Sequence, residues 1–578
     1  MNERNQADLL SPLGIATTRY EERSAASLGF GGHAPVKFEE NQALCGAGVL
    51  FLLPALLEQG LLKTSSVYSL PQNHYYGLES VVLTLAFMAL ARIKNPEQLK
   101  QCKPGEIGRI IGLDRIPEVR CLRDKIKLLT SQRKATELNN LLIDHWYSGK
   151  QEDAGFLYID GHQRIYYGDQ ANLPSKYISR QKLCLSATTE YWVNDAQGMP
   201  LMMVMGELTE KLQTAIEEYI IPQMQQTNLL KHPPSKNKKI PRCTFIFDRE
   251  AYEPAFFQRL WKKYRIAVIT YRKNVKDTWR EDRFKSIDTT VLENTVTMLL
   301  CEDKIKLGGH RFREVRRLGK DGHQTAIITT HPTIDMTTIA GRMFGRWSQE
   351  NFFRYMIQDY DFDKMIEFGT ETIDTEQKVV NPQYRKINYL IKKLREKKQR
   401  VQAKFYPLAE SAMEEDIEQI PAITQKQIEH KELLNQYKKQ EVELIEKRKQ
   451  CPHKITLKEM PEKTRYNKLK TESKLLINVI KMICYRAETA VVELLAQYLN
   501  REKNEKRMFI KQIISNNANL MPDYKNKTLT VELHILSAQR FNEAAAQLAQ
   551  LLTETQTIFP GSDLKMIFKT TAQPVCER

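Results

Sequence analysis

The segment Phe245-Ile246-Phe247-Asp248-Arg249-Glu250 is a short apolar run that ends in an acidic tripeptide. Its pattern predicts a fully buried strand that carries Asp248 to the carboxyl edge of a sheet, where open α/β folds place their chemistry. A second segment, Gly155-Phe156-Leu157-Tyr158-Ile159-Asp160-Gly161-His162, has the same arrangement around Asp160. We therefore expect two strands that each end at an aspartate.

A third acid, Glu350, lies in a segment with helical patterning, Gly345-Arg346-Trp347-Ser348-Gln349-Glu350-Asn351-Phe352-Phe353-Arg354-Tyr355. Two strand-end aspartates and a helical glutamate form an all-oxygen ligand set suited to Mg²⁺ and to phosphoryl transfer. Any one of these acids alone would more simply cap a helix or face solvent. The order Asp160, Asp248, Glu350 on strand, strand and helix favours a shared site.

The chain is basic overall, with 87 Lys and Arg against 70 Asp and Glu and a formal charge of +17. Such an excess favours a polyanionic partner, although charge can also serve solubility alone. The 578 residues allow for roughly three or four domains, and 42% apolar residues suffice for real cores.

Nine cysteines are scattered singly, without a C-x-x-C or His-x-x-x-His pair. This spacing argues against a zinc module and a disulfide framework and fits a reducing cytoplasm. The longest apolar runs, Ala47–Leu57 and Val81–Ala91, are shorter than the roughly 20 residues of a membrane span. Because the N-terminus also lacks a signal-peptide pattern, we expect a cytoplasmic, nucleoid-associated protein without membrane contact.

Residues 1–40 are polar and are expected to be loosely ordered. Residues 41–150 show helical patterning and form a candidate DNA-binding domain. Within it, Pro104–Leu129 predicts two helices, with a turn near Gly112 and with Pro117 at the first position of the second helix.

The second of these helices has a polar side and an apolar side. Arg120 and Arg123 lie opposite the apolar positions Val119, Leu122 and Ile126. The pattern fits the basic recognition helix of a helix-turn-helix. A plain structural helix pair would give the same pattern, so DNA contact at Arg120 and Arg123 is one of two interpretations.

Residues 151–272 predict the first part of a ribonuclease H-like core in an α/β multidomain protein. Two hairpins are expected, the first across Gly161-His162 and the second across the turn Asn194–Gly198. The elements then continue as a helix, the Asp248 strand, a second helix and a final strand: Thr209–Met224, Phe245–Asp248, Pro254–Tyr264 and Ile266–Tyr271. Three strands, helix, strand, helix, strand is the order of the ribonuclease H-like fold, whose first and fourth strands each contribute a metal-binding aspartate.

The rest of the chain divides into four parts. Short alternating strands predict a β insertion over residues 273–333, and residues 334–375 return to the core with the Glu350 helix. Residues 376–505 are a charged helical region, which would support dimerisation or DNA contact, and residues 506–578 form a small α/β unit.

From about residue 40 to 375, and more loosely beyond, the chain resembles bacterial insertion-sequence transposases of the DDE class. It is most similar to the cut-and-paste group with a β-strand insertion between the second Asp and the Glu. Asp248-Arg249-Glu250 is similar to that group's second catalytic motif. The third motif reads Tyr-x2-Arg-x3-Glu-x6-Lys. Arg346 and Glu350 keep its spacing, whereas Met343 and Ile357 replace its Tyr and Lys.

The resemblance implies a metal-dependent enzyme that cleaves and transfers DNA strands at insertion-sequence ends. Asp160, Asp248 and Glu350 would be the catalytic and metal-binding residues for two Mg²⁺ ions, which Mn²⁺ could replace. Double-stranded DNA, as element ends and target, would be the partner, and the protein would form a homodimer on it.

Further residues are candidates for DNA contact. Arg346 and Arg354 share a helix face with Glu350 and would hold phosphates, or would form salt bridges on a solvated face. Arg272 and Lys273 end a strand beside the site. Trp279 would stack on a base flipped from the DNA end, as in the resembling group, or would pack as an ordinary aromatic residue.

Two other functions remain open from the sequence. The chain could be a ribonuclease H-like, metal-dependent DNA nuclease without strand transfer, for example in defence. It could also be a non-catalytic DNA-binding protein derived from a transposase, although such a protein would have no chemical need for all three acids.

Overall fold

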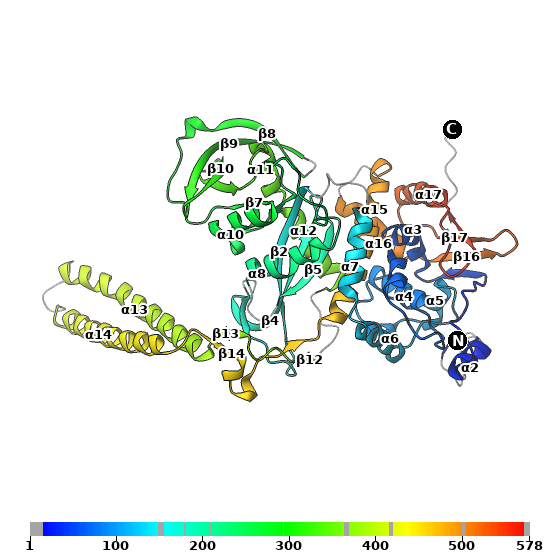
Figure 1. Cartoon of the computed structure of the whole chain (residues 1–578), viewed down its shortest axis with the longest axis horizontal. Coiled ribbons are helices and arrows are strands. Elements are labelled where there is room, and N and C mark those ends of the chain that lie inside the picture. The colour runs from blue at the N-terminus through cyan, green and yellow to red at the C-terminus, as the bar shows by residue number, and fades with distance from the viewer. Residues whose placement is uncertain are drawn as a thin grey trace. The chain divides into compact units, whose positions relative to one another are not determined.

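The computed structural model describes residues 15–147, 155–178, 181–206, 211–292, 294–362, 369–414, 420–499 and 503–571. The fold is mixed α/β and contains several sheets (Figure 1). The chain divides into two compact units. The first comprises Met1–Ile165, Thr188–Phe368 and Lys470–Arg578, and the second comprises Tyr166–Ala187 and Gly369–Leu469.

The first unit is built on a large sheet in which β2 and β6 are neighbours. The strands run in the order β5-β4-β2-β6-β7, and the sheet continues beyond β7. Strand β6 is parallel to both β2 and β7, whereas β4 and β5 are antiparallel to each other. The bounds are β2 Phe156–Ile165, β4 Leu183–Asn194, β5 Pro200–Gly206, β6 Cys243–Ile246 and β7 Ile266–Tyr271.

Strand β2 corrects the first predicted hairpin. Phe156–Ile165 is one continuous strand that runs through Gly161 and His162 without a turn. A Cβ on Gly161 would lie 3.1 Å from the Tyr191 ring, so this glycine allows a close approach between strands. His162 is buried and stacks on Phe353, with ring centres 5.6 Å apart. The second predicted hairpin is confirmed by the pairing of β4 with β5.

Both faces of the central strands are buried, which explains their continuous apolar runs. Leu157 and Ile159 of β2 belong to one apolar cluster, and Tyr158 between them belongs to another. Helical segments join these clusters: α8 Leu212–Ala215, η5 Ile216–Ile220, α9 Ile221–Gln225, α10 Pro254–Arg259, η7 Leu260–Tyr264 and α11 Met336–Phe344. The helix predicted from Thr209 begins outside the described residues.

The β insertion extends the same sheet. Its strands are β8 Lys285–Val291, β9 Asn294–Leu307, β10 His310–Leu318 and β11 Gln324–Thr329. They pair antiparallel in sequence order, and β11 also pairs with β7. The insertion therefore continues the core sheet, and the chain returns from it to α11 and to α12, Trp347–Tyr360.

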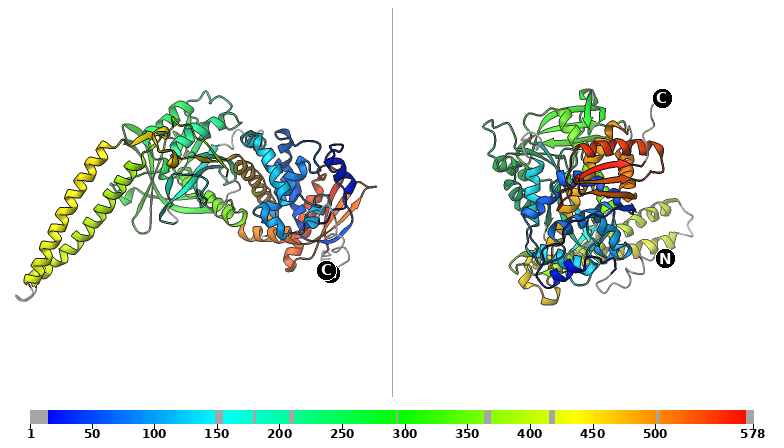
Figure 2. Two further views of the ribbon diagram at one scale, coloured as in Figure 1. Left: turned by 90° about the horizontal axis from the view of Figure 1, so that it is seen from below. Right: turned by 90° about the vertical axis from the view of Figure 1, so that its right-hand side faces the viewer.

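The N-terminal and C-terminal segments share one core. Helix α15, Glu472–Leu494, packs against four N-terminal helices: α3 Leu53–Glu58, α4 Leu78–Leu90, α6 Val119–Ser131 and α7 Ala135–Trp146. A second sheet has the order β1-β16-β17-β18, so the N-terminal strand β1 forms its edge. Figure 2 shows these first and last segments side by side. The strands of this second sheet are β1 Asn41–Leu44, β16 Ala518–Asp523, β17 Thr528–Leu533 and β18 Lys565–Thr570.

Residues 15–40 are held in place rather than loosely ordered, whereas residues 1–14 lie outside the described residues. Helix α2, Tyr20–Ser27, carries Arg23, which forms a 2.6 Å ion pair with Asp114. Asp114 also accepts a hydrogen bond from Tyr75 at 2.8 Å. The polar composition of this segment therefore reflects an ion-paired anchor.

The second unit contains a long helical hairpin. Helices α13, Pro382–Glu414, and α14, Ile420–Gln450, pack against each other. Strand β13, Lys378–Val380, pairs with β14, Lys454–Thr456, at the base of the hairpin. Both long helices lie in the region predicted to be charged and helical, residues 376–505. No helix in the described residues is long and apolar enough to cross a membrane.

Candidate active site

Asp160 and Asp248 lie at the same level of two neighbouring strands. Asp248 follows the end of β6 as predicted, whereas the prediction that Asp160 ends its strand was wrong, because β2 continues to Ile165. The parallel strands β2 and β6 pair Tyr158 with Ile246. Each aspartate follows its paired residue by two positions, so both lie at the same level beyond the paired segment. Neighbouring strands are about 4.8 Å apart, and the sheet register therefore brings these two aspartates together.

The backbone around Asp248 is fixed by local hydrogen bonds. Its carboxylate accepts a 2.7 Å bond from the backbone N–H of Glu250 and caps the short helix η6, Arg249–Ala251. The Thr270 hydroxyl donates to the Asp248 carbonyl oxygen at 3.0 Å. The chain thus turns immediately after β6 with Asp248 at the sheet edge.

Glu350 is positioned by its neighbour Gln349 at the start of α12. Gln349 is fully buried, and its Nε2 lies within hydrogen-bonding distance of Tyr158 O, at 3.2 Å, and Trp192 O, at 3.3 Å. It also contacts Asn194 Oδ1 at 2.9 Å. These contacts fix the first turn of α12 to β2 and β4, and Glu350 follows directly.

Arg346 connects the strand to the helix. Its guanidinium lies 3.4 Å from Asp160 Oδ2 and 2.8 Å from Glu350 Oε1. The Arg346 and Asp160 side chains are 17% and 21% exposed, so their ion pair is largely shielded from solvent. Arg346 therefore contacts two of the three predicted acids.

The three acids also interact electrostatically. Burial raises the pKa of Asp160 to about 6, although Arg346 opposes the rise. The negative charges of Asp248 and Glu350 raise the pKa of Asp160 further. Asp160 is therefore easier to protonate than an ordinary carboxyl, mainly because it is buried and partly because two other acids lie nearby.

The donor chemistry fits Mg²⁺, but the acids do not form a preformed metal site. In the described parts of the chain, no group of three or more His, Cys, Asp or Glu side chains is arranged to hold a metal ion. The guanidinium of Arg346 stands between Asp160 and Glu350. A cation shared by these two carboxylates therefore requires Arg346 to move.

Arg272 and Trp279 belong to a charged network in the β insertion. Arg272 pairs with Glu314 at 2.7 Å and with Asp277 at 3.4 Å. The Arg316 guanidinium lies 4.3 Å from the Trp279 ring centre, and the backbone N–H of Trp279 donates to Gln324. Both candidate DNA-binding residues therefore have protein partners in this structure.

Lys273 and Arg354 have looser surroundings. Lys273 Nζ lies 5.9 Å from the Tyr252 ring centre. Arg354 is exposed and donates a 3.1 Å hydrogen bond to Asn351 Oδ1. This bond does not connect Arg354 to Arg346 or to the acids.

The two helices predicted for DNA recognition are α5, Pro104–Ile110, and α6. Helix α6 begins at Val119, two residues after Pro117, and residues 111–118 connect the two helices. This connection is longer than the 3–4 residues typical of a helix-turn-helix. Arg120 and Arg123 are exposed, as the pattern predicted.

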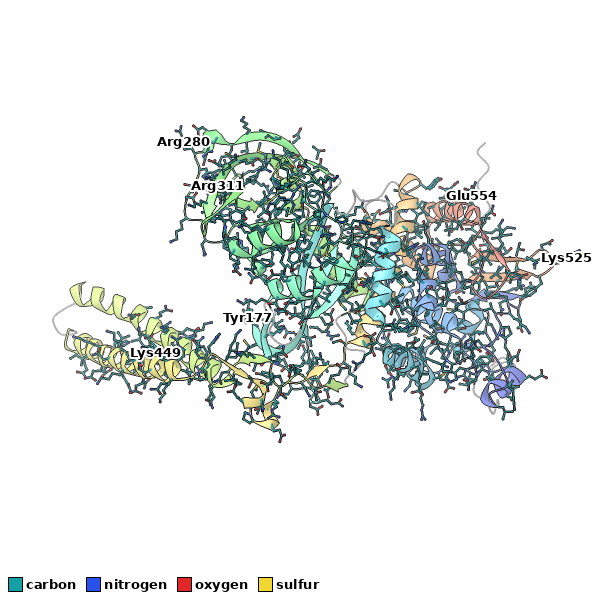
Figure 3. The ribbon with its side chains drawn as sticks, viewed as in Figure 1. Tyr177, Arg280, Arg311, Lys449, Lys525 and Glu554 are labelled. Atoms are coloured by element: carbon teal, nitrogen blue, oxygen red, sulfur yellow. The ribbon has the colours of Figure 1, made fainter. Side chains whose placement is uncertain are left out.

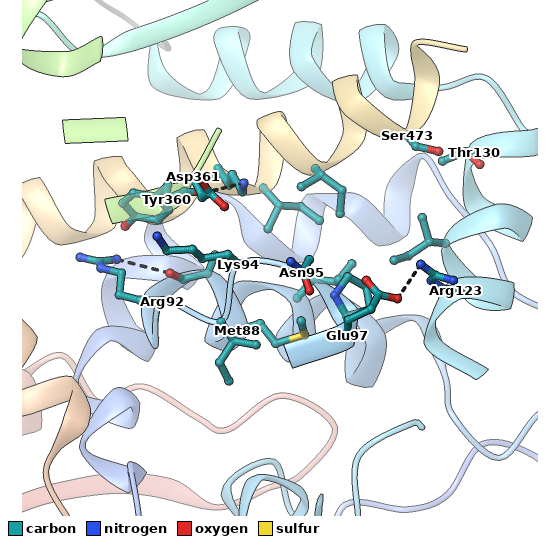
Figure 4. Close-up of a pocket in the computed structure, with 18 of the residues that line it drawn as sticks. Met88, Arg92, Lys94, Asn95, Glu97, Arg123, Thr130, Tyr360, Asp361 and Ser473 are labelled. Atoms are coloured by element: carbon teal, nitrogen blue, oxygen red, sulfur yellow. Dashed lines mark hydrogen bonds and ion pairs between the residues drawn. The ribbon is translucent and has the colours of Figure 1, made fainter. Parts of the chain in front are cut away.

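Arg123 lies at a cavity in the helical region (Figure 4). It forms a 2.5 Å ion pair with Glu97, and the cavity of about 410 Å³ has apolar walls that include Met88 and Ile480. Burial lowers the pKa of Lys481 in its wall to about 8, and Lys481 donates to Tyr360 O at 2.7 Å. None of the three acids lines this cavity.

Two residues beside the acids were not singled out from the sequence. Gln349 positions Glu350, and its only sequence signal was its place in the motif. Trp347, next to Arg346, is 62% exposed, although large aromatic side chains are usually well buried.

Comparisons with known proteins address the family directly. No curated protein and no solved structure matches the chain. A family model described as a transposase protein matches residues 14–572, so the chain belongs to this transposase family.

Proposed function

We propose that this transposase uses a DDE mechanism, in which Asp160, Asp248 and Glu350 support metal-dependent cleavage and transfer of DNA strands at insertion-sequence ends. Family membership implies DNA as the partner. The observation that carries the proposal is the register of β2 and β6, because Asp160 and Asp248 each lie two positions beyond the last pair of these strands. Arg346 then links Asp160 to Glu350 on α12.

The arrangement of the core supports a ribonuclease H-like assignment. A helical segment, β6, a second helical segment and β7 follow β2, β4 and β5, and the short additional strand β3, Ser175–Ile178, comes between β2 and β4 and pairs with β4. Apart from β3, this is the expected order of three strands, helix, strand, helix, strand. Strand β2 lies between β4 and β6, and the two strands that lead to the aspartates are direct neighbours.

In the proposed reaction, the three acids would hold two Mg²⁺ ions. These ions would activate the attacking oxygen and stabilise the leaving oxygen of an in-line displacement. Arg346 would release Glu350 and bind a phosphate of the DNA, because a guanidinium matches the geometry of carboxylates and phosphates alike. The fixed start of α12 would keep Glu350 at the sheet edge during this exchange.

Other parts of the chain would bind the DNA and a second subunit. Arg120 and Arg123 on α6 would contact element ends, and Arg272, Lys273 and Arg354 would contact the backbone near the acids. Trp279 would stack on a flipped base only after parting from Arg316. The protein would act as a homodimer assembled on paired ends.

A strand-transfer assay tests the proposal. The full chain is incubated with Mg²⁺, a supercoiled target and a labelled duplex that carries the inverted repeats flanking the gene. We expect labelled ends joined covalently to the target. Cleaved ends without joined products would identify a nuclease, and uncleaved but bound ends would identify a non-catalytic DNA-binding protein.

A further inference from the structure

The helical hairpin of the second unit has an uneven charge distribution. Between Pro382 and Ala403, α13 carries eight Lys and Arg residues and one acid, Glu396. Helix α14 alternates lysines with glutamates and is nearly balanced. A solvated helical hairpin needs no such difference between its helices, so the basic charge of α13 calls for a specific explanation.

The basic residues of α13 include a stripe on one face. Lys386, Lys393, Lys397 and Arg400 are separated by seven, four and three positions. At 3.6 residues per turn, these spacings return to the same side of the helix. With a rise of 1.5 Å per residue, the stripe is about 21 Å long.

The stripe is separate from the face that holds the hairpin together. Ile391 and Leu394 are buried, whereas the four stripe residues are exposed. Figure 3 shows side chains projecting from the hairpin, with Lys449 of α14 labelled.

Neighbouring acids do not neutralise the stripe. Glu441 of α14 pairs with Arg395 at 2.6 Å and with Lys398 at 2.9 Å. Among the residues that the structure describes, no carboxylate pairs with any stripe residue. Tyr389, beside the stripe, is 61% exposed, and Lys393 Nζ lies 6.0 Å from its ring centre.

We propose that this stripe of α13 binds the phosphate backbone of duplex DNA. Duplex DNA carries one negative charge per about 1.7 Å of axis, and its major groove is about 12 Å wide. A cationic stripe of about 21 Å can therefore reach phosphates on both sides of that groove. The inference rests on DNA as the family's substrate and is independent of the catalytic acids.

The same charges argue against a second copy of the hairpin as the occupant of this face. Two identical stripes would bring like charges together, which is unfavourable. A homodimer that forms through the stripe is the competing interpretation, and the experiment below distinguishes it from DNA binding.

The experiment compares two full-length variants that lose the same number of charges. The stripe variant is K386Q/K393Q/K397Q/R400Q, and the matched control is K431Q/K438Q/K439Q/K447Q, which removes four exposed lysines of α14. A third variant, K386R/K393R/K397R/R400K, keeps every charge. Circular dichroism and thermal melting establish that all three fold as the wild type does. Binding to a fluorescein-labelled duplex of random sequence is measured by anisotropy over a series of KCl concentrations without divalent metal, so that cleavage does not interfere.

We expect the stripe variant to lose at least roughly tenfold in affinity at low salt, with a plot of log K against log salt that is shallower by up to about 3.6. The α14 control and the charge-keeping variant should bind nearly as the wild type does. Equal losses in the stripe variant and the α14 control, or none in either, would overturn the proposal. It would also be overturned if sedimentation without DNA showed that the wild type dimerises and the stripe variant does not, because the stripe would then be a subunit interface. Failure here leaves the catalytic proposal intact, since that proposal is judged by cleavage and joining.

Discussion

Arg346 lies 3.4 Å from Asp160 Oδ2, although 186 positions separate the two residues in the chain. The same guanidinium holds Glu350, so an acid within a strand and an acid on a helix share one cation. Burial and the negative charges of Asp248 and Glu350 raise the pKa of Asp160, although Arg346 opposes the rise. This balance between one arginine and three carboxylates gives the site a measurable pH signature.

Asp160→Asn should stabilise the metal-free protein at pH 8. The pKa of Asp160 is raised to about 6, above its ordinary value of 3.8, so ionised Asp160 costs folding free energy above that range. We expect a gain in unfolding free energy of about 1–3 kcal/mol at pH 8, which shrinks as the pH falls below about 6 and vanishes only by about pH 3, where folded and unfolded chains are both protonated. Urea unfolding in EDTA at several pH values measures it.

Asp303→Asn is the matched control for that measurement. Arg283 holds the pKa of Asp303 below its ordinary value, so the ionised form of Asp303 favours folding. This substitution should give no gain at pH 8. An equal gain in both variants would show that general charge reduction, and not the buried cluster, is responsible.

Gln349→Leu should destabilise the protein and impair cleavage together. The variant removes the buried amide that lies within hydrogen-bonding distance of Tyr158 O, Trp192 O and Asn194 Oδ1, at a cost of roughly 1–3 kcal/mol. It also releases the first turn of α12, so Glu350 loses its position. Denaturant unfolding and single-turnover cleavage check the two effects. A destabilised variant with a wild-type cleavage rate at low temperature would show that Gln349 does not position Glu350.

Substitution of Arg120 and Arg123 by Gln should weaken binding to element ends far more than it weakens folding. Both side chains are exposed, and the ion pair of Arg123 with Glu97 joins two exposed groups, which contributes little stability. If these arginines read bases, each should contribute about 1–3 kcal/mol of discrimination between specific and scrambled duplexes. Mobility shifts with both duplexes measure this difference.

Glu97→Gln provides the comparison, because it frees Arg123 without removing it. This variant should bind DNA at least as tightly as the wild type. Unchanged affinity in the double arginine variant would assign α6 to structure alone.

The strands and the helix that carry the three acids could be predicted from the sequence. Strands buried on both faces are continuously apolar, and this local signal located Asp248 and Asp160. The turn predicted at Gly161 was wrong, because a glycine in a strand can also admit a neighbouring ring, here that of Tyr191. That neighbour is distant in sequence and invisible to local patterns.

Pairing between segments far apart in the chain also could not be predicted from the sequence. The backbone N–H of Ala43 bonds to Asn519 across 476 positions, and this contact joins an N-terminal strand to the C-terminal sheet. The ion pairs of Arg272 with Glu314 and Asp277 likewise depend on how the insertion folds back on the sheet. The place of Arg272 at a strand end did not reveal these protein partners.

The central claim is that Asp160, Asp248 and Glu350 act together in metal-dependent cleavage, and the most direct measurement is cleavage by Asp248→Asn. The amide keeps the shape of the carboxylate but loses the charge that holds Mg²⁺. Cleavage of an end-carrying duplex in Mg²⁺ is compared with that of Glu253→Gln, an exposed acid on the same connection that lies outside the cluster. We predict that Asp248→Asn abolishes cleavage and retains DNA binding, whereas Glu253→Gln cleaves as the wild type does. Near wild-type cleavage by Asp248→Asn would contradict the assignment of the active site.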